Sequence, residues 1–198
     1  TPTICNGGSA NISIAVTGTG PWSGTLSSGQ SFSGATSPIT VSVSPSSTTS
    51  YTVATLSDAN CTSVSADFSG TATVTVNPRP TAVISGTPTI CNGGSANISI
   101  AVTGTGPWSG TLSSGQSFSG ASSPITVSVS PSATTSYTVA TLSDANCTAV
   151  SGDLSGSATV SVNPRPTAVI SGTPTICDRK STRLNSSHSS VSRMPSSA

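Results

Sequence analysis

The sequence repeats itself almost unchanged after 86 residues. Residues 1–8, TPTICNGG, return at 87–94, and residues 173–177 begin a third copy. Only seven of the 86 aligned positions differ between residues 1–86 and 87–172. A period of this length is the size of a domain and not of a solenoid repeat. The two copies must therefore share one fold, and each must bury a core of its own.

Short apolar segments within each copy alternate with turns rich in Gly, Pro and Ser. Residues 95–103 place Ile98, Ile100 and Val102 on one face, with small or polar residues between them, which is typical of a half-buried strand. Seven strands in 86 residues indicate two facing sheets, and we therefore predict an all-β fold of tandem β-sandwich domains. In the second copy the predicted strands are residues 81–85, 95–103, 107–112, 116–118, 124–130, 136–142 and 157–163.

The predicted domain boundaries follow the repeat and its prolines. Residues 1–78 form a repeat without its first strand, 79–164 a complete repeat, and 165–177 the start of a truncated third repeat. The joints are short Pro-rich linkers, Asn77-Pro78-Arg79-Pro80 and its copy at residues 163–166, and closely spaced prolines favour an extended, stiff backbone. The N-terminus has neither an initiator Met nor a signal peptide, so we expect it to be an internal cut.

Residues 178–198 depart from the repeat. After Cys177 the third copy should continue Asn-Gly-Gly, but residues 178–188 read DRKSTRLNSSH. This segment, and residues 192–198 in a consistent frame, resemble the translation of a short-read sequencing adapter. We therefore expect residues 178–198 to be an artefactual, disordered C-terminal tail without a function.

Composition and charge exclude several classes of function for residues 1–177. Two arginines stand against four aspartates there, so the net charge is −2 and no basic surface supports nucleic-acid binding. No apolar run is long enough for membrane insertion. His, Lys and Glu are absent, so the many serines have no side-chain base of these types to activate them. We expect a protein that is not an enzyme and needs no cofactor.

The four aspartates lie in pairs, Asp58 with Asp67 and Asp144 with Asp153, in the long loop before the last strand of each copy. Such a pair would serve as a general acid and base, or would bind calcium together with the asparagine that lies between them. The spacing matches no calcium-loop motif. A turn-forming role explains the four aspartates best, and they are weak candidates for a metal site.

Trp22 and Trp108 occupy the same position in the two copies. An exposed Trp would stack on a sugar ring, whereas a Trp on the third strand of such a sandwich normally lies in the core. Core packing is therefore the favoured interpretation of both residues, and glycan contact is the alternative.

Several motifs together resemble a known type of repeat. They are TICNGGS near the start of each copy, GPWSG around the Trp, TTSYTV around the Tyr, and SDANC in the loop that follows. These motifs resemble the immunoglobulin-like or PKD-like repeats of very large surface proteins of gliding bacteria, which are commonly exported through the type IX secretion system. The resemblance covers residues 1–177. It implies tandem immunoglobulin-like β-sandwich domains that act as a structural spacer in a secreted or cell-surface adhesin.

The resemblance is specific for the type of repeat and not for a ligand. The partners that it implies are the neighbouring repeats of the same chain, and the implied location is extracellular or at the cell surface. The alternative function is a module that binds surface glycans or matrix proteins through exposed loops or the Trp surface.

The cysteines allow more than one disulfide pattern. Cys5 and Cys61 are 56 residues apart, as are Cys91 and Cys147, and an extracellular protein permits disulfides. Cys91 precedes the second strand and Cys147 follows the sixth, so we expect them at opposite ends of one sandwich, about 20 Å apart and beyond disulfide reach. A bridge from Cys5 to Cys147 of the next repeat would then be feasible. Pairing within each repeat, pairing across repeats and free thiols all stay open.

Overall fold

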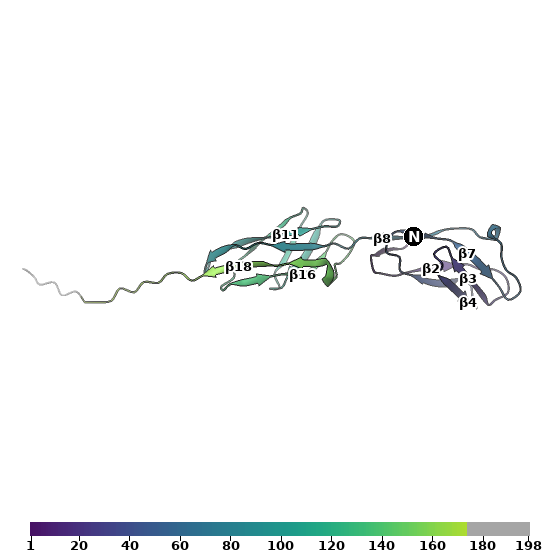
Figure 1. Ribbon diagram of the computed structural model, residues 1–198, viewed down its shortest axis with the longest axis horizontal. Coiled ribbons are helices and arrows are strands. Elements are labelled where there is room, and N and C mark those ends of the chain that lie inside the picture. Colours follow the sequence, from purple (N-terminus) through teal and green to yellow (C-terminus); the bar gives the residue numbers. More distant parts are fainter. Residues whose placement is uncertain (174–198) are drawn as a thin grey trace, which may run out of the picture. The chain divides into compact units, whose positions relative to one another are not determined.

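The computed structural model describes residues 1–173, which contain 18 strands and two short 3-10 turns, Ser65–Asp67 and Ser151–Asp153. Figure 1 shows the strands of each repeat gathered into a body of their own. The predicted tail, residues 178–198, lies outside the described residues. Strands of the first repeat are β1 (Thr3–Cys5), β2 (Ala10–Ile14), β3 (Trp22–Leu26), β4 (Ser31–Gly34), β5 (Ile39–Val43), β6 (Thr49–Tyr51), β7 (Val53–Ser57) and β8 (Ala72–Asn77). Strands of the second are β9 (Ala82–Ser85), β10 (Thr89–Cys91), β11 (Ala96–Val102), β12 (Trp108–Leu112), β13 (Ser117–Gly120), β14 (Ile125–Val129), β15 (Thr135–Tyr137), β16 (Val139–Ser143), β17 (Leu154–Gly156) and β18 (Ala158–Asn163).

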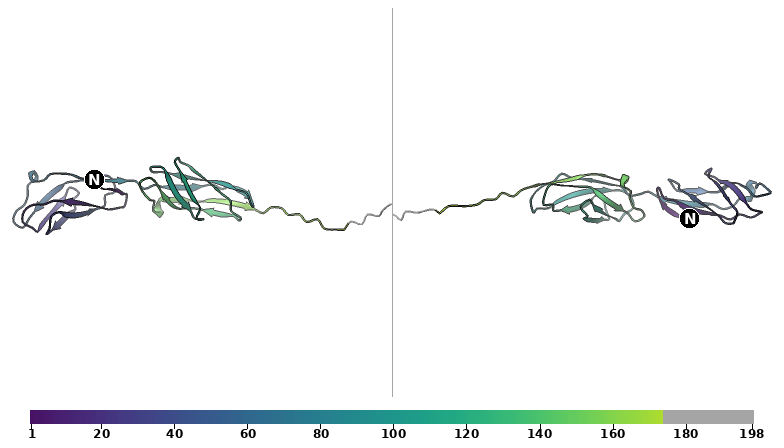
Figure 2. Two further views of the ribbon diagram at one scale, coloured as in Figure 1. Left: turned by 180° about the vertical axis from the view of Figure 1, so that it is seen from behind. Right: turned by 90° about the horizontal axis from the view of Figure 1, so that it is seen from below.

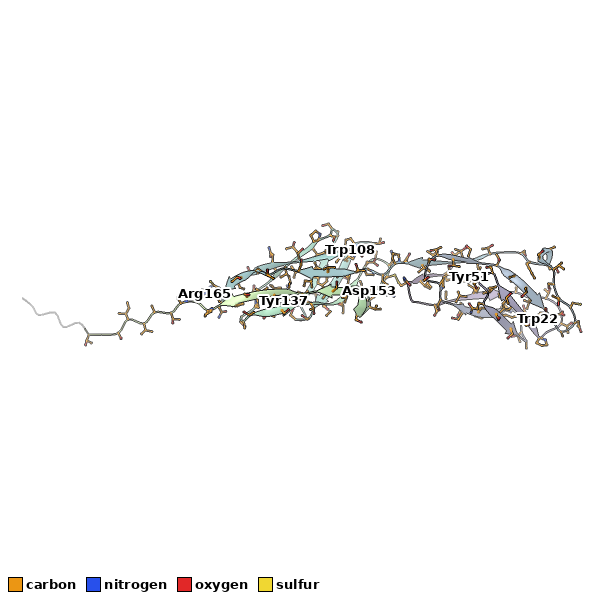
Figure 3. The ribbon with its side chains drawn as sticks, in the orientation of Figure 1. Trp22, Tyr51, Trp108, Tyr137, Asp153 and Arg165 are labelled. Atoms are coloured by element: carbon orange, nitrogen blue, oxygen red, sulfur yellow. A yellow bond between two sulfur atoms is a disulfide. The ribbon has the colours of Figure 1, made fainter. Side chains whose placement is uncertain are left out.

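The second repeat is a sandwich of two layers. One layer is a four-stranded sheet in the order β14-β11-β9-β17, and the other consists of the sheets β13-β12-β16 and β10-β18-β15, joined through the consecutive strands β15 and β16. Neighbouring strands are antiparallel except for two parallel pairs, β10 with β18 and β17 with β9. Figure 2 gives two further views of the ribbon, and in Figure 3 Tyr51 marks the first repeat and Tyr137 the second. The predicted all-β fold of tandem immunoglobulin-like sandwiches is confirmed.

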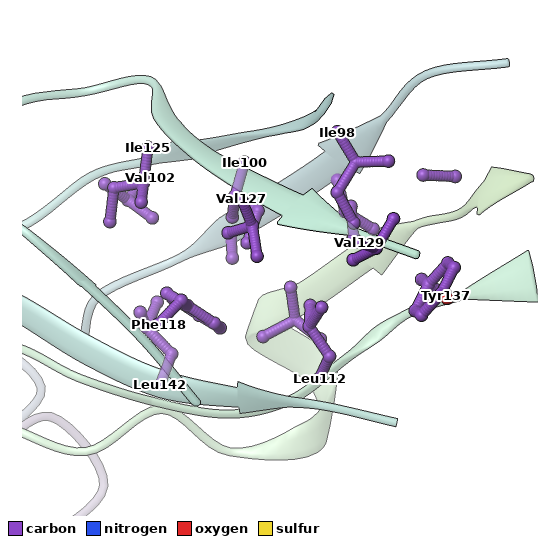
Figure 4. Close-up of a cluster of buried hydrophobic side chains, with 14 of the residues drawn as sticks. Ile98, Ile100, Val102, Leu112, Phe118, Ile125, Val127, Val129, Tyr137 and Leu142 are labelled. Carbon is purple, nitrogen blue, oxygen red and sulfur yellow. The ribbon is translucent and has the colours of Figure 1, made fainter. Parts of the chain in front are cut away.

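Apolar residues at every second position of the facing strands fill the space between the layers. Ile98 and Ile100 on β11 are 1% and 0% exposed, and Val127 on the neighbouring strand β14 pairs with Ile98. Figure 4 shows Leu112 and Leu142 pointing toward them from the opposite layer. Burying side chains of this size contributes roughly 1.5–3 kcal/mol each, so this core can hold the repeat together without charged groups.

The first repeat has the same layers but lacks one strand. Thr1 aligns with Thr87, so no residue of the first repeat aligns with β9. The four-stranded sheet is thereby reduced to the pair β2-β5, and no strand forms at the position equivalent to β17. Ile14, which aligns with the buried Ile100, is only half-buried. The core of the first repeat is therefore open along β2.

Three details of the strand pattern differ from the prediction. Strands β10 and β17 were not expected, because each spans only three residues and is held by its pairing with β18 or β9. The strand predicted over 136–142 is divided at Thr138, since β15 pairs with β18 while β16 pairs with β12. At Thr138 the chain thus crosses from the sheet that contains β18 to the sheet that contains β12.

Residues 164–173, which follow the second repeat, contain no strand. By its contacts the chain divides into a unit of residues 1–165 and a second unit that begins at Pro166. Val169 and Ile170 of this second unit are 90% and 100% exposed. Among the residues that the structure describes, no helix has the length and apolar character needed to cross a membrane.

Candidate functional site at the junction between repeats

Cys5 is fixed at the end of the first repeat from which the linker leaves. It is the last residue of β1, and β1 runs parallel to β8 so that Cys5 lies opposite Asn77, the last residue of β8. The backbone N–H of Asn6 donates to the carbonyl of Asn77 at 2.9 Å, which continues the pairing one residue further. The linker therefore starts directly beside the Cys5 side chain.

Cys147 lies in the loop after β16, and Asp144 shapes that loop. One carboxylate oxygen of Asp144 accepts the N–H groups of Asn146 and Cys147 at 2.8 and 2.7 Å, and the other accepts that of Thr105 at 2.8 Å. Burial raises the pKa of Asp144, but these three hydrogen bonds outweigh that effect and the pKa is lowered overall. A charged carboxylate thus ties the Cys147 loop to the loop after β11.

A disulfide joins Cys5 to Cys147 across the two repeats, with a Cα–Cα distance of 5.8 Å and a sequence separation of 142. This is the cross-repeat arrangement among those that the sequence left open. Pairings within a repeat do not form, because Cys91 lies opposite Asn163 at one end of the second repeat while Cys147 meets Cys5 at the other. Cys61 and Cys91 are exposed free thiols.

Arg79, in the linker, contacts both repeats. Its Nη1 donates to the carbonyl of Asn6 at 2.6 Å, while Nε and Nη2 donate to the two carboxylate oxygens of Asp153 at 2.7 and 3.3 Å. The hydrogen bond from Arg79, assisted by the Val150 N–H, holds the pKa of Asp153 below its usual range, and Asp153 raises the pKa of Arg79. Arg79 was not among the functional residues predicted from the sequence, although it is one of only two arginines in residues 1–177.

Pro80 anchors the linker in the second repeat. Its side chain is among the most deeply buried in the described chain. Gly104, with a φ of +109°, lies against it: a Cβ at Gly104 would come within 3.2 Å of Pro80 Cα. The linker is thus held by packing, by an ion pair and by the adjacent disulfide.

Asp58 shapes the corresponding loop of the first repeat. Asp58 accepts the N–H groups of Thr19, Asn60 and Cys61 at 2.9, 2.8 and 2.7 Å, and these bonds, that of Thr19 first, hold its pKa below the usual range. Asp67 accepts the N–H of Val64 at 3.0 Å.

This loop borders a small recess. Asp58, Asp67, Trp22 and Cys61 line it together, in a volume of about 140 Å³. Each of the four predicted aspartates accepts at least one N–H from its own turn, as turn-forming residues do. Within residues 1–173, no group of three or more His, Cys, Asp or Glu side chains is placed to hold a metal ion.

Trp22 and Trp108 are 9% exposed and belong to the cores of their repeats. Their indole N–H groups donate to the carbonyls of Thr17 and Thr103, each at 3.0 Å. The ring faces are covered by the core, so neither Trp is available to stack on a sugar. The suggestion of glycan contact through Trp22 and Trp108 is therefore corrected, and the packing interpretation accounts for both side chains.

Each repeat also has a shallow hollow over its β3-β4 or β12-β13 strands. The hollows measure about 470 and 510 Å³. Gly24 or Gly110 lies at each, where a Cβ would come within 2.7 Å of the ring of Phe32 or Phe118. Serine and threonine hydroxyls line the rest, with no charged side chain. These surfaces offer hydrogen bonds but no group for acid–base chemistry.

No known protein family matches this chain, and no curated protein matches it in sequence. Two solved structures are similar in fold. One is a variant, with Glu-to-Ala mutations, of titin domains I67–I69, with a TM-score of 0.49, 14% identity, and coverage of 83% of this chain and 63% of the titin chain. The other is the titin I-band fragment I67–I69, with a TM-score of 0.40, 12% identity, and coverage of 84% and 63%. The chain thus spans less than two thirds of either titin fragment, and identity this low concerns the fold alone.

Proposed function

We propose that this chain is a segment of a structural spacer, in which successive immunoglobulin-like repeats are held to one another by fixed junctions. The observation that carries the proposal is the Cys5–Cys147 disulfide, which joins two domains with separate cores. The effect of this bond is to limit how the two repeats can move relative to each other.

The other contacts of the junction support the same role. Arg79 makes hydrogen bonds to Asn6 on one side and Asp153 on the other, and Pro80 is buried against the second repeat. Short linkers without such contacts leave neighbouring domains free to reorient. A spacer benefits from domains that cannot reorient, because fixed junctions between successive repeats keep the two ends of the chain apart.

The proposed setting is a secreted or cell-surface, adhesin-like protein, exported through a type IX route as in the proteins that its motifs resemble. The disulfide supports an oxidising compartment, since such bonds persist outside the reducing cytosol. A surface rich in hydroxyls and poor in charge suits a passive stalk. We propose no catalytic role, and we take the partners to be neighbouring repeats of the same type.

Small-angle scattering tests this function by comparing the wild type with two matched variants. Cys147→Ser removes the junction disulfide, whereas Cys61→Ser removes the aligned free thiol of the first repeat. At low protein concentration, we expect the wild type and Cys61→Ser to give the same narrow distribution of interatomic distances and Cys147→Ser a broader one. A wild type as variable as Cys147→Ser would contradict the proposal.

A further inference from the structure

The Cys5–Cys147 disulfide closes a large covalent loop. The two residues have a sequence separation of 142, so residues 6–146 lie between two points that the bond holds together. The loop contains the first repeat after β1, the linker, and the second repeat as far as β16. The buried core residues of the first repeat all lie inside it, as do those of the second except Ala158 and Val160.

Within the two repeats, two short segments stay outside the loop. One is the chain before Cys5, which forms β1, and the other is residues 147–163, which include β17 and β18. Cys147 meets Cys5 at the junction, whereas Asn163 lies beside Cys91 at the opposite end of the second repeat. Residues 147–163 therefore already cross the second repeat in its folded state.

Pulling on the chain outside a covalent loop cannot draw out the residues inside it. Tension applied before β1 and after β18 runs along β1 to Cys5, through the disulfide to Cys147, and along residues 147–163. Fully extended, 142 residues would span about 500 Å, and the bond removes this length from the path. Residues 147–163 span at most about 60 Å, of which the six residues of β18 already cover about 20 Å.

We propose that the junction disulfide is a load-bearing bypass, which carries tension past residues 6–146 and keeps both repeats from being drawn out. The proposal rests on the proposed spacer function, because a spacer that holds two ends apart is under tension when those ends are pulled. The bypass does more than fix the positions of the repeats. It limits the length of the chain even after a repeat has lost its fold, since residues that unfold inside the loop add nothing to the tensioned path.

The part of this path that can still lengthen, residues 147–163, is held at several points. At its start, the N–H of Cys147 donates to Asp144 at 2.7 Å. Further along, Asp153 accepts hydrogen bonds from Arg79 of the linker at 2.7 and 3.3 Å. Strand β17 pairs with β9, and β18 pairs with both β10 and β15. Because all of these partners belong to the loop, the tensioned segment is tied to the residues that the bond shields.

Single-molecule stretching of the full chain, held by handles fused to its two ends, tests the bypass. Without the bond, each repeat should unfold in a step of roughly 250 Å, because the 86 residues of one period span about 300 Å when extended. With the bond, the wild type should show no such step and should lengthen by at most about 40 Å as residues 147–163 are drawn out.

Two variants and a reductant separate the bond from other causes of a short extension. The double variant Cys5→Ser/Cys147→Ser, in which neither residue can pair elsewhere, should give two full steps, and Cys61→Ser should behave as the wild type. A phosphine reductant, added to the folded wild type to convert the bond to two thiols, should also give two full steps. This measurement does not depend on the folding of the double variant.

The force of the short extension reports on the contacts of the tensioned segment. Arg79→Ala removes the hydrogen bonds to Asp153 and leaves the disulfide in place. The variant should therefore release residues 147–163 at a lower force, with the extension unchanged.

Two results would each overturn the bypass: full steps of about 250 Å in the unreduced wild type, or an extension equally short with and without the bond. The spacer proposal fails by a different measurement. Full steps together with a narrow distance distribution in scattering would overturn the bypass alone. A short extension together with a distribution as broad as that of Cys147→Ser would overturn the fixed junction alone.

Discussion

Cys5 and Cys147 are 142 residues apart in sequence, yet their Cα atoms lie 5.8 Å from each other and their sulfurs are bonded. Each repeat has a core of its own, so neither fold needs this bond to close its sandwich. The bond instead restricts the conformations that one repeat can adopt when it unfolds while its neighbour stays folded. It therefore links the stability of the two repeats as well as their positions.

Removing the bond should lower stability without changing either core. Cys147→Ser is expected to reduce the free energy of unfolding by about 2–4 kcal/mol, because the unfolded chain gains entropy when the crosslink is lost. Cys61→Ser, at the aligned and unbonded position, should leave it unchanged. Denaturant titration followed by Trp fluorescence measures both values, and an equal effect of the two variants would show that the bond contributes nothing.

Because the first repeat has no counterpart of β9, truncating Ile100 should lower the free energy of unfolding more than truncating the aligned Ile14. Ile100 is 0% exposed and lies beside Ile84 of β9 in the same sheet, so Ile100→Ala is expected to destabilise the second repeat by about 3–5 kcal/mol. Ile14 is only half-buried beside the open edge of β2, and Ile14→Ala should cost only about 1–2 kcal/mol. Denaturant titration compares the two variants. Equal costs would mean that Ile14 is as well covered in solution as Ile100.

Sequence patterns predicted the fold well where the burial of a face decides the structure. The alternation over 95–103 locates β11, and the position of Trp108 in a buried strand follows from its place in the repeat. The short strands β10 and β17 were missed because their own residues carry no period, and only pairing with β18 and β9 makes them strands.

The site was harder to predict than the fold, because it depends on which loops meet at a joint. Spacing placed Cys91 and Cys147 at opposite ends of a repeat but left the pairing open. Arg79 was predicted only as part of the linker, because its partners, Asn6 and Asp153, are determined by how the two repeats meet. In a chain with so few charges, a linker arginine that recurs in each copy was the available signal.

Arg79 should control the ionisation of Asp153. Removing the guanidinium in Arg79→Ala is expected to raise the pKa of Asp153, because the Arg79 hydrogen bond is the largest cause of its lowered value. Arg165→Ala, which removes the aligned arginine at the other end of the repeat, should not change it. Carboxyl chemical shifts followed by NMR during a pH titration give both values. An unchanged Asp153 pKa in Arg79→Ala would show that the ion pair does not form in solution.

The stability of the folded chain should not change with pH near neutrality but should decrease in acid. Asp58 and Asp144 have lowered pKa values in the folded chain, so both favour folding above the unfolded pKa of about 3.9. That contribution is lost as the pH falls through the lower folded values. We expect a melting temperature that is level near neutral pH and declines below about pH 4. In Asp144→Asn, which keeps an acceptor oxygen but no charge, the decline should be shallower, and an equally steep decline would contradict the assignment.

Mapping the disulfides tests the junction between the repeats most directly, and the positions of the aspartates allow a suitable digestion. Cleavage of the denatured, unreduced chain before each Asp leaves every cysteine in a separate fragment: residues 1–57, 58–66, 67–143, 144–152 and 153–177. Fragments 58–66 and 144–152 differ at two positions, so mass spectrometry distinguishes them. We predict that fragment 1–57 is linked to fragment 144–152, through Cys5 and Cys147. A link from 1–57 to 58–66, or from 67–143 to 144–152, would place the bonds within each repeat and contradict the cross-repeat junction.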